Sequence, residues 1–226
     1  MKTEVIIPAA GFGVRFESKQ AKSLVLLGPK PILVHTLQAF EQSVLVDDVI
    51  LVTQEPLIPE IKDLIKQYKL SKVKHIVTGG QARSESVRNG LKYVDQDTEF
   101  VVIHDGARPL ITGAFIDKII PFCYREQALI TAVPVKPTIK RVDKNLVVAQ
   151  TLKRDELWEI QTPQIFKREI ILKAHQEFGH EDTTDDAALV EKLGVKVKVV
   201  MGDYRNIKIT TKEDLAIAET LLNRIS

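Results

Sequence analysis

Residues 5–15 read Val-Ile-Ile-Pro-Ala-Ala-Gly-Phe-Gly-Val-Arg, an apolar and largely β-branched run that leads directly into a turn of small residues. The run predicts a short strand over 5–9, and the small residues after it leave backbone amides open to phosphate oxygens. Arg15 and Lys22 add positive charge close by. The pattern also fits a plain strand-to-helix turn with solvated cations. Phe16 stands where a dinucleotide fingerprint needs a third glycine, and the sequence contains no Gly-Lys-Ser/Thr of a Walker loop.

Strand-like and helical patterns alternate along the rest of the chain. Further strands are expected at 48–53, 75–78, 100–104 and 128–134, and helices at 32–40, 58–68 and 84–94. Later in the chain we expect helices at 167–178 and 185–193, strands at 195–200 and 206–209, and a last helix from Thr211, which has capping-box spacing with Asp214. Such alternation requires crossover connections. It predicts an α/β fold with a mostly parallel sheet covered by helices on both faces.

A hairpin interrupts this alternation. Residues 139–142 and 146–150 are strand-like and flank Asp143-Lys144-Asn145, a pattern typical of two paired strands and their turn. No internal repeat, low-complexity segment or linker divides the sequence. We therefore predict a single domain over residues 1–226, with a hairpin arm at about 136–156.

The composition is that of an ordinary globular protein. Of 226 residues 44% are hydrophobic, and the formal net charge is only +2, so no strong field favours nucleic acid. Cys123 is the only cysteine, which excludes an intrachain disulfide and a thiolate zinc site. No apolar run approaches the roughly 20 residues that span a bilayer, and the chain starts on a strand pattern rather than a signal peptide. We expect a cytoplasmic protein that binds neither nucleic acid nor a membrane.

A second glycine turn lies between the strand at 75–78 and the helix that follows it. It reads Gly79-Gly80-Gln81-Ala82-Arg83-Ser84. At the N-terminus of a helix, the dipole and the free amides favour anions or polar bases. The alternative is ordinary N-capping by Ser84, with Glu85 favourable in the first turn.

The segment His104-Asp105-Gly106-Ala107-Arg108-Pro109 closes an apolar strand, and the carboxyl ends of such strands are where open α/β sheets bind ligands. Asp105 is the best candidate for a metal ligand, because a hard cation such as Mg²⁺ takes one or two carboxylates together with substrate phosphates. The alternative is a structural ion pair between Asp105 and Arg108.

Other polar features point away from common site types. The five histidines show neither His-x-x-x-His spacing nor a serine motif of a hydrolase triad. The acidic run 181–186 lacks the glycine and terminal glutamate of an EF-hand. We interpret it as a polar loop and helix start in which Asp185 or Asp186 holds a neighbouring basic group.

Taken in order, five motifs resemble the 2-C-methyl-D-erythritol 4-phosphate cytidylyltransferase family, and the resemblance covers essentially the whole chain. The motifs are residues 8–15, 79–83, 104–109, Gln161-Thr162-Pro163-Gln164 and Asn206-Ile207-Lys208-Ile209-Thr210. The resemblance implies a Rossmann-like nucleotidyltransferase fold, a homodimer with shared active sites, CTP as nucleotide donor, and Mg²⁺ or another divalent cation.

The resemblance also implies roles for particular residues. Arg15, Lys22 and Lys208 match the cations that hold the phosphates, and Ala9, Ala10, Gly11, Gly13, Gly80, Gln81 and Ser86 match nucleotide-binding positions. Asp105 and Arg108 match the site of the metal and the substrate, while Thr138 and Arg154 match arm residues that reach the substrate phosphate in the partner subunit. Ala21-Lys22-Ser23 departs from the Pro-Lys-Gln that the family commonly has, although it keeps the lysine.

The expected reaction transfers CMP from CTP to 2-C-methyl-D-erythritol 4-phosphate in the non-mevalonate route to isoprenoid precursors. A phosphate monoester is already largely ionised near neutral pH, so positioning and charge stabilisation suffice and no protein nucleophile is needed. Two alternatives remain open at this stage: a cytidylyltransferase that uses ribitol 5-phosphate, and a nucleotide-binding protein without activity.

Overall fold

The computed structural model describes residues 1–11, 21–181 and 183–222, and its centre is a seven-stranded sheet. The strand order is β11-β7-β10-β6-β1-β4-β5. Among these strands, β10 alone runs antiparallel to its neighbours. The strands are β1 (Thr3–Pro8), β4 (Asp48–Thr53), β5 (Val73–Thr78), β6 (Phe100–Ile103), β7 (Ala128–Pro134), β10 (Trp158–Lys167) and β11 (Lys198–Met201).

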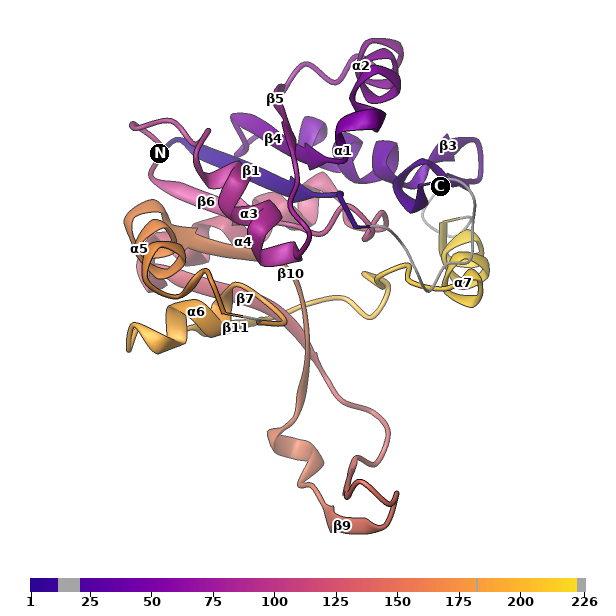
Figure 1. Ribbon diagram of the computed structural model, residues 1–226, viewed down its shortest axis with the longest axis vertical. Helices are drawn as coiled ribbons and strands as arrows, with labels where there is room; N and C mark the ends of the chain where they lie inside the picture. Colours follow the sequence, from indigo (N-terminus) through magenta and orange to yellow (C-terminus); the bar gives the residue numbers. More distant parts are fainter. Residues whose placement is uncertain (12–20, 182, 223–226) are drawn as a thin grey trace.

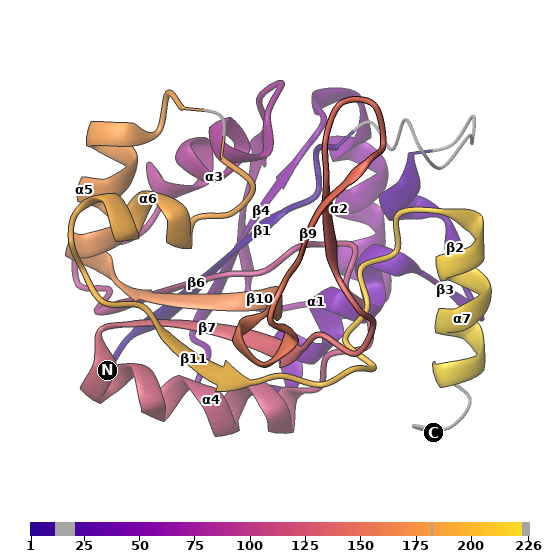
Figure 2. The same cartoon turned by 90° about the horizontal axis from the view of Figure 1, so that it is seen from below.

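Helices cover both faces of the sheet (Figure 1). One face packs against α1 (Ile32–Gln42), α2 (Ile58–Gln67) and α4 (Gly113–Glu126). The other packs against α3 (Arg83–Leu91), α5 (Arg168–Phe178) and α6 (Ala187–Lys192). Figure 2 shows α3, α5 and α6 on one side of the sheet and α4 on the other. The last helix, α7 (Lys212–Leu222), lies beside the short pair β2 (Leu26–Leu27) and β3 (Lys30–Pro31).

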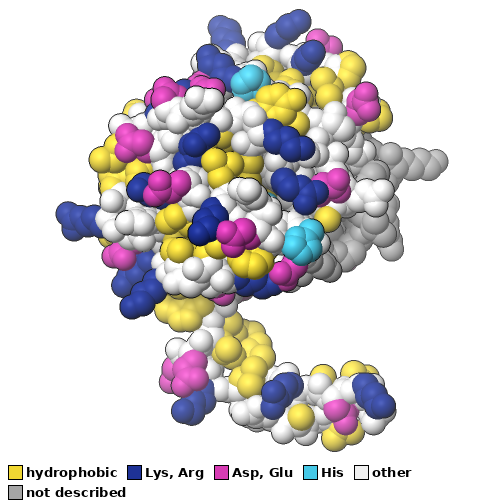
Figure 3. Space-filling model, turned by 60° about the vertical axis from the view of Figure 1, so that its left-hand side comes forward, with side chains coloured by type: hydrophobic (Ala, Val, Ile, Leu, Met, Phe, Trp, Pro, Cys, Tyr) yellow, Lys and Arg dark blue, Asp and Glu magenta, His cyan; other side chains and the backbone are white. Residues whose placement is uncertain are grey.

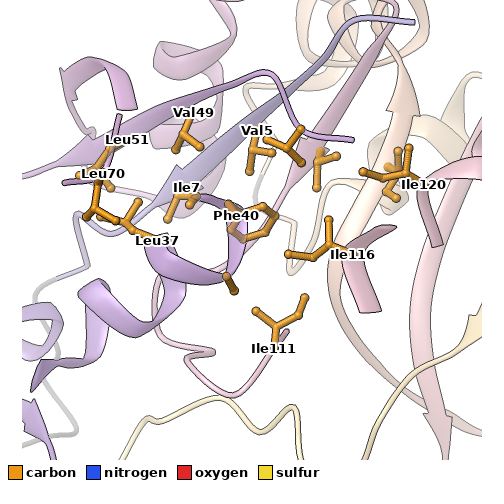
Figure 4. Packing of buried hydrophobic residues seen from close by; sticks show 14 of the residues in the cluster. Val5, Ile7, Leu37, Phe40, Val49, Leu51, Leu70, Ile111, Ile116 and Ile120 are labelled. Atoms are coloured by element: carbon orange, nitrogen blue, oxygen red, sulfur yellow. The ribbon is translucent and has the colours of Figure 1, made fainter. Parts of the chain in front are cut away.

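The alternation of side chains along each strand builds these two layers. In β1, Val5 and Ile7 enter the core under α1, whereas Ile6 enters the core under α3. The neighbouring strands β4 and β6 divide their residues in the same way. All of these side chains are buried, as expected for a parallel sheet covered on both faces. Figure 4 shows the first core, with Phe40 of α1 facing Val5 and Ile7.

The topology places two loops side by side at the carboxyl ends of the strands. The central strand β1 has β4 on one side and β6 on the other, so the chain order reverses between them. A reversal of this kind leaves a crevice outside the strand ends, which is the usual ligand site of open α/β sheets. The segments that follow β1 and β6 are the ones singled out in the sequence as candidate phosphate and metal loops.

The hairpin projects away from this body (Figures 1 and 3). Its strands are β8 (Lys140–Val142) and β9 (Val148–Thr151), and β7 and β10 lead into and out of it. The 3-10 turn η4 (Arg154–Glu156) lies on its return path. All residues of β8 and β9 are exposed, and Leu146 at the tip is 83% exposed.

The α/β architecture and the hairpin predicted from the sequence are confirmed, with three differences. We did not predict helix α4, whose pattern is broken by Gly113 at its start and Pro121 inside it. Nor did we predict strand β10, because Thr162-Pro163 suggests a turn. The strand expected at 206–209 was wrong: these residues are described but form no ladder, and Ile209 makes a single backbone bond to Ala107.

The predicted start of the last helix is confirmed. Thr211 and Asp214 form the predicted reciprocal capping box at the start of α7, with bonds of 2.9 and 3.2 Å. None of the helices in the described ranges is both long and apolar enough to cross a bilayer. On the face seen in Figure 3, basic and acidic side chains are interspersed, in keeping with the small net charge.

Candidate active site

Asp105 lies two residues after the end of β6, and its carboxylate is buried among cations. Oδ1 accepts from Nε of Arg83 at 2.8 Å, and Oδ2 accepts from Nζ of Lys208 at 2.8 Å. Nε of Arg108 is 3.8 Å from Oδ2. Burial opposes ionisation of Asp105, but the charges of Arg83, Lys208 and Arg108 outweigh it and hold the pKa of the carboxyl well below its usual range. Of the three ion pairs of Asp105, the one with Arg108, which the sequence suggested as an alternative, therefore has the longest N–O distance.

The backbone of Asp105 is fixed by the motif at 161–164. Thr162 lies where β10 gains extra residues relative to β7, between Ile160 and Gln164, and such bulges redirect side chains. Its hydroxyl accepts from the amide of Asp105 at 3.0 Å. The hydroxyl also lies 3.2 Å from Nδ1 of His104. The bulge therefore ties β10 to the loop that carries the carboxylate.

The protonation of His104 follows from its two partners. Its Nε2 lies 3.2 Å from the carbonyl of Arg108, which can only accept, so Nε2 carries the hydrogen. Nδ1 then accepts from the hydroxyl of Thr162. Burial lowers the pKa of His104 to about 4, so the ring is neutral at pH 7. The neutral ring completes a chain of bonds from Asp105 through Thr162 to Arg108.

Lys208 is positioned by buried Asn206. The side-chain amide of Asn206 donates to the backbone carbonyl of Thr162 at 2.8 Å, and the backbone carbonyl of Asn206 accepts from Nη1 of Arg108 at 2.7 Å. Gln161 holds the preceding turn through its bond to the carbonyl of Asp203. Side-chain hydrogen bonds, in place of a strand ladder, thus hold the segment 206–209 against the sheet. They place Lys208 beside Asp105.

The two glycine turns pack against each other. A Cβ at Gly79 would lie 2.3 Å from Cβ of Ala10, so only glycine permits this approach. Ser86 and Glu85 of α3 hold the second turn: Ser86 Oγ accepts from the amide of Gly80, and Glu85 accepts from the amide of Gln81. The N-cap of α3 is Ala82, so the alternative interpretation, N-capping by Ser84, is wrong.

A cavity of about 140 Å³ opens between these loops. The residues that line it come from five segments of the chain: Pro8, Ala9, Ala10, Gly11, Lys22, Ser23, Gly80, Gln81, Ala82, Arg83, Ser86, Asp105, Gly106, Ala107 and Lys208. Nine of the residues predicted from the sequence are therefore brought together here: Ala9, Ala10, Gly11, Lys22, Gly80, Gln81, Ser86, Asp105 and Lys208. Lys22 begins the 3-10 turn η2 (Lys22–Leu24), and Ala21 before it has a φ of −57°, which a proline would also adopt.

A second cavity, of about 440 Å³, adjoins the first. It shares Arg83, Asp105 and Lys208 with the first cavity, and Arg108 lies in its wall. Two ligands in these cavities would therefore meet at one carboxylate flanked by cations. Such an arrangement suits the joining of two anionic groups, because their mutual repulsion is offset by fixed positive charge.

Two of the predicted site residues that the structure describes lie away from both cavities. Thr138 and Arg154 are exposed in the arm and line neither cavity among the residues that the structure describes. Nη1 of Arg154 instead donates to the carbonyl of Lys136 at 3.0 Å. Gly13 and Arg15 lie outside the described residues.

Sequence reasoning missed the role of Arg83. This residue stands inside a motif that we quoted, yet its partners Asp105 and Asp186 are 22 and 103 positions away. The expectation that Asp185 or Asp186 holds a basic group is confirmed for Asp186. No local pattern could have named Arg83 as that group, since the contact depends on how α3 and α6 pack beside the sheet.

A divalent cation fits the oxygen chemistry of Asp105. Within the described part of the chain, it is the single acid in the wall of the first cavity, and the lowered pKa of its carboxyl keeps it ionised. Each of its oxygens accepts one bond from a cation, which leaves a further lone pair on each. Mg²⁺ commonly takes one or two carboxylates and completes its shell with water and substrate phosphates.

Comparison with known proteins gives a consistent picture. Residues 3–224 match the sequence family described as 2-C-methyl-D-erythritol 4-phosphate cytidylyltransferase. Proteins of that name from Halalkalibacterium halodurans and Alkaliphilus metalliredigens are 47% and 45% identical to this chain. The alignments cover 98% and 99% of this chain, and 97% and 94% of those proteins.

Two solved structures of proteins with related names are similar to this chain over nearly its whole length. The crystal structure of 4-diphosphocytidyl-2C-methyl-D-erythritol synthase from Anaerococcus prevotii is similar with a TM-score of 0.86 and 34% identity, over 98% of this chain and 96% of that one. The crystal structure of 2-C-methyl-D-erythritol 4-phosphate cytidylyltransferase from Thermus thermophilus is similar with a TM-score of 0.81 and 27% identity. The match covers 99% of this chain and 100% of that one.

The buried His104 predicts a loss of stability in mild acid. An unfolded histidine titrates near 6.5, whereas burial lowers the pKa of His104 to about 4. Between these values the unfolded chain binds a proton that the folded chain does not, so the free energy of unfolding falls as pH falls. From pH 7 to pH 5 this group should account for a loss of about 2 kcal/mol. Urea unfolding of the wild type and of His104→Gln at both pH values measures the difference, and equal pH dependence in the two proteins would contradict it.

Proposed function

This chain belongs to the 2-C-methyl-D-erythritol 4-phosphate cytidylyltransferase family, and we propose that it performs the reaction of this family where its two cavities meet at Asp105. The chain transfers CMP from CTP to 2-C-methyl-D-erythritol 4-phosphate, and it releases 4-diphosphocytidyl-2-C-methyl-D-erythritol and pyrophosphate. The reaction is a step in the synthesis of isoprenoid precursors. The observation that carries the assignment of the site is the meeting of Asp105, Lys22, Lys208 and both glycine turns in one cavity wall.

The first cavity suits the nucleotide. The backbone carbonyls of Gly80 and Gln81, beside Ser86, can accept from the amino group of a small base, and the turn at 10–11 offers amides to phosphate oxygens. The second cavity, with Arg108 in its wall, suits the polyol of the acceptor. The acceptor phosphate and the α-phosphate of CTP would then approach each other beside Asp105 and Lys208.

The chemistry needs no protein nucleophile. An oxygen of the acceptor phosphate attacks the α-phosphorus, a new P–O bond forms, and the bond from the α-phosphorus to the bridging oxygen breaks as pyrophosphate leaves. Lys22 and Lys208 would neutralise negative charge that gathers on the α-phosphoryl group and the leaving pyrophosphate, and we assign the same role to Arg15. The acceptor oxygen is already ionised, so no proton has to be removed.

Asp105 would hold the divalent cation. When bound, Mg²⁺ would supply positive charge to the phosphates and so lower their repulsion of the incoming oxygen. Asp105 is suited to this task because Arg83 and Lys208 keep it ionised although its side chain is only 9% exposed.

We further propose that the active form is a homodimer in which the arms are exchanged. The arm exposes Val142, Leu146, Val147 and Val148, and a hairpin this small needs a surface to pack against. Within one chain, the described residues Thr138 and Arg154 stay outside both cavities. A second copy related by a two-fold axis would bring them to the acceptor phosphate of its partner.

Lys208→Ala should lower kcat by about 10²-fold or more while the fold stays intact, because one charge-stabilising donor is removed from the transition state. The assay measures pyrophosphate released from CTP and 2-C-methyl-D-erythritol 4-phosphate, with ribitol 5-phosphate and omission of the acceptor as controls. Lys212→Ala, which removes an exposed lysine at the start of α7, should keep near wild-type kcat. A Lys208→Ala protein with wild-type kcat would refute the assignment.

The dimer proposal predicts complementation between two inactive variants. If Arg154 acts in the partner's site, a mixed dimer of Lys22→Ala and Arg154→Ala has one site with both defects and one whole site. With random pairing about half the dimers are mixed, so activity should return to about a quarter of wild type. Should Arg154 serve its own chain, every site keeps one defect, and no activity would appear even with subunit exchange verified by mass-labelled chains.

A further inference from the structure

Two buried carboxylates lie on either side of Arg83. Its Nε donates to Oδ1 of Asp105 at 2.8 Å, and its Nη1 donates to Oδ2 of Asp186 at 2.6 Å. The planar guanidinium thus spans the two acids, which a lysine with its single point charge cannot do. Burial opposes the charge on Arg83, but Asp186 and Asp105 outweigh it and raise the pKa of the guanidinium.

Asp186 is held in place without help from Arg83. The amide of Asp186 donates to Oε1 of Gln164 at 3.2 Å, and its Oδ1 lies 3.0 Å from Nε2 of His175. Gln164 is fully buried in β10 and also accepts from the amide of Ala187 at the start of α6. Asp186 itself is 1% exposed. It is therefore a rigid anchor, fixed by β10 and α5, on which Arg83 can be oriented.

The carboxylate of Asp186 reaches the site through Arg83. Among the described residues, neither Asp186 nor His175 lines either cavity, whereas Arg83 lines both. A ligand in the cavities would touch Arg83 and Asp105 but not Asp186. Gln164, which lines the second cavity, is bonded to the backbone amide of Asp186 and not to its side chain. An effect of the Asp186 carboxylate on the reaction is therefore expected to pass through the guanidinium of Arg83.

Sharing the guanidinium also matters for charge. A guanidinium that binds a single carboxylate would offset nearly all of its negative charge. A guanidinium shared between two carboxylates offsets less of the charge on each. Asp105 can then remain ionised and oriented and still attract a cation on the cavity side. Without Asp186, Arg83 would lose one of its two anchors, and its full charge would act on Asp105.

We propose that Asp186 is a positioning residue, which acts through Arg83 to set the orientation and the charge of Asp105 where the two cavities meet. This inference rests on the proposed function, because it assigns Asp105 a part in the reaction. Asp186 is not a catalytic residue, since it lines neither cavity and would touch neither ligand.

A double-mutant cycle tests the proposal. The proteins are wild type, Asp186→Asn, Asp105→Asn and the double variant, each checked for folding by circular dichroism and thermal melting. Asp186→Asn should lower kcat/KM for CTP by about 10–100-fold, the usual effect of losing a residue that orients a ligand-contacting group. In the double variant, Asp186→Asn should add less than about 2-fold to the loss from Asp105→Asn, because its route to the reaction is already gone.

Glu4→Gln is the matched control. Glu4 is also a buried acid, 2% exposed, whose carboxylate accepts from the amide of Asp95 and the hydroxyl of Thr98 near the opposite end of β1. A folded Glu4→Gln protein should keep kcat/KM within about 2-fold of wild type, even if its melting temperature falls as far as that of Asp186→Asn. This comparison separates loss of stability from loss of positioning.

The other outcomes overturn the proposal. Losses that multiply in the double variant, or a folded Asp186→Asn protein with wild-type kcat/KM, would show that Asp186 does not act through Asp105. If Asp186→Asn does not fold, Asp186→Glu replaces it in the cycle, because it keeps the charge but displaces the carboxylate from Nη1 of Arg83; multiplied losses there would likewise overturn the proposal. A wild-type protein that releases no pyrophosphate from the two substrates would instead overturn the proposed function, and this inference with it.

Discussion

The structure depends on keeping one carboxylate ionised inside the protein. An isolated buried charge is strongly unfavourable, so Asp105 requires cations close by, and Arg83, Lys208 and Arg108 supply them. Each cation needs its own support in turn. Asp186 holds Arg83, and the carbonyl of Asn206 holds Arg108. The network is therefore a set of mutually dependent polar contacts, and it gives the site its geometry before any ligand binds.

The fold makes this network possible by bringing distant segments to one sheet edge. The parallel strands β1 and β6 end side by side, so the turns that follow them share a wall of the first cavity. Antiparallel β10 crosses between β6 and β7, and its bulge points Thr162 toward the loop of Asp105. The same strand fastens α6 through Gln164 and the segment of Lys208 through Thr162. One irregular strand thus joins three parts of the site that lie far apart in the sequence.

Much of this could be predicted from the sequence, because strand patterns and glycine turns are local. The run at 5–9, the turn at 79–81 and the placement of Asp105 after an apolar strand all gave correct positions for cavity residues. The elements and residues that the sequence did not predict depend on packing and on contacts between distant segments. Pro163 and Pro121 contradict the local preference of the elements that contain them, and tertiary packing overrides that preference. Arg83, Asp186 and Gln164 act through contacts between segments far apart in the chain, and no spacing rule reveals such contacts.

The central claim is that the cavity around Asp105 is the nucleotide site, with both lysines on the phosphates. A crystal structure of this protein with CTP and Mg²⁺ tests it most directly. We expect the cytosine against Gly80 and Gln81, phosphate oxygens within hydrogen-bond distance of Lys22 and Lys208, and Arg83 still bridging Asp105 and Asp186. CTP bound outside this cavity, or in it with its phosphates away from both lysines, would contradict the account.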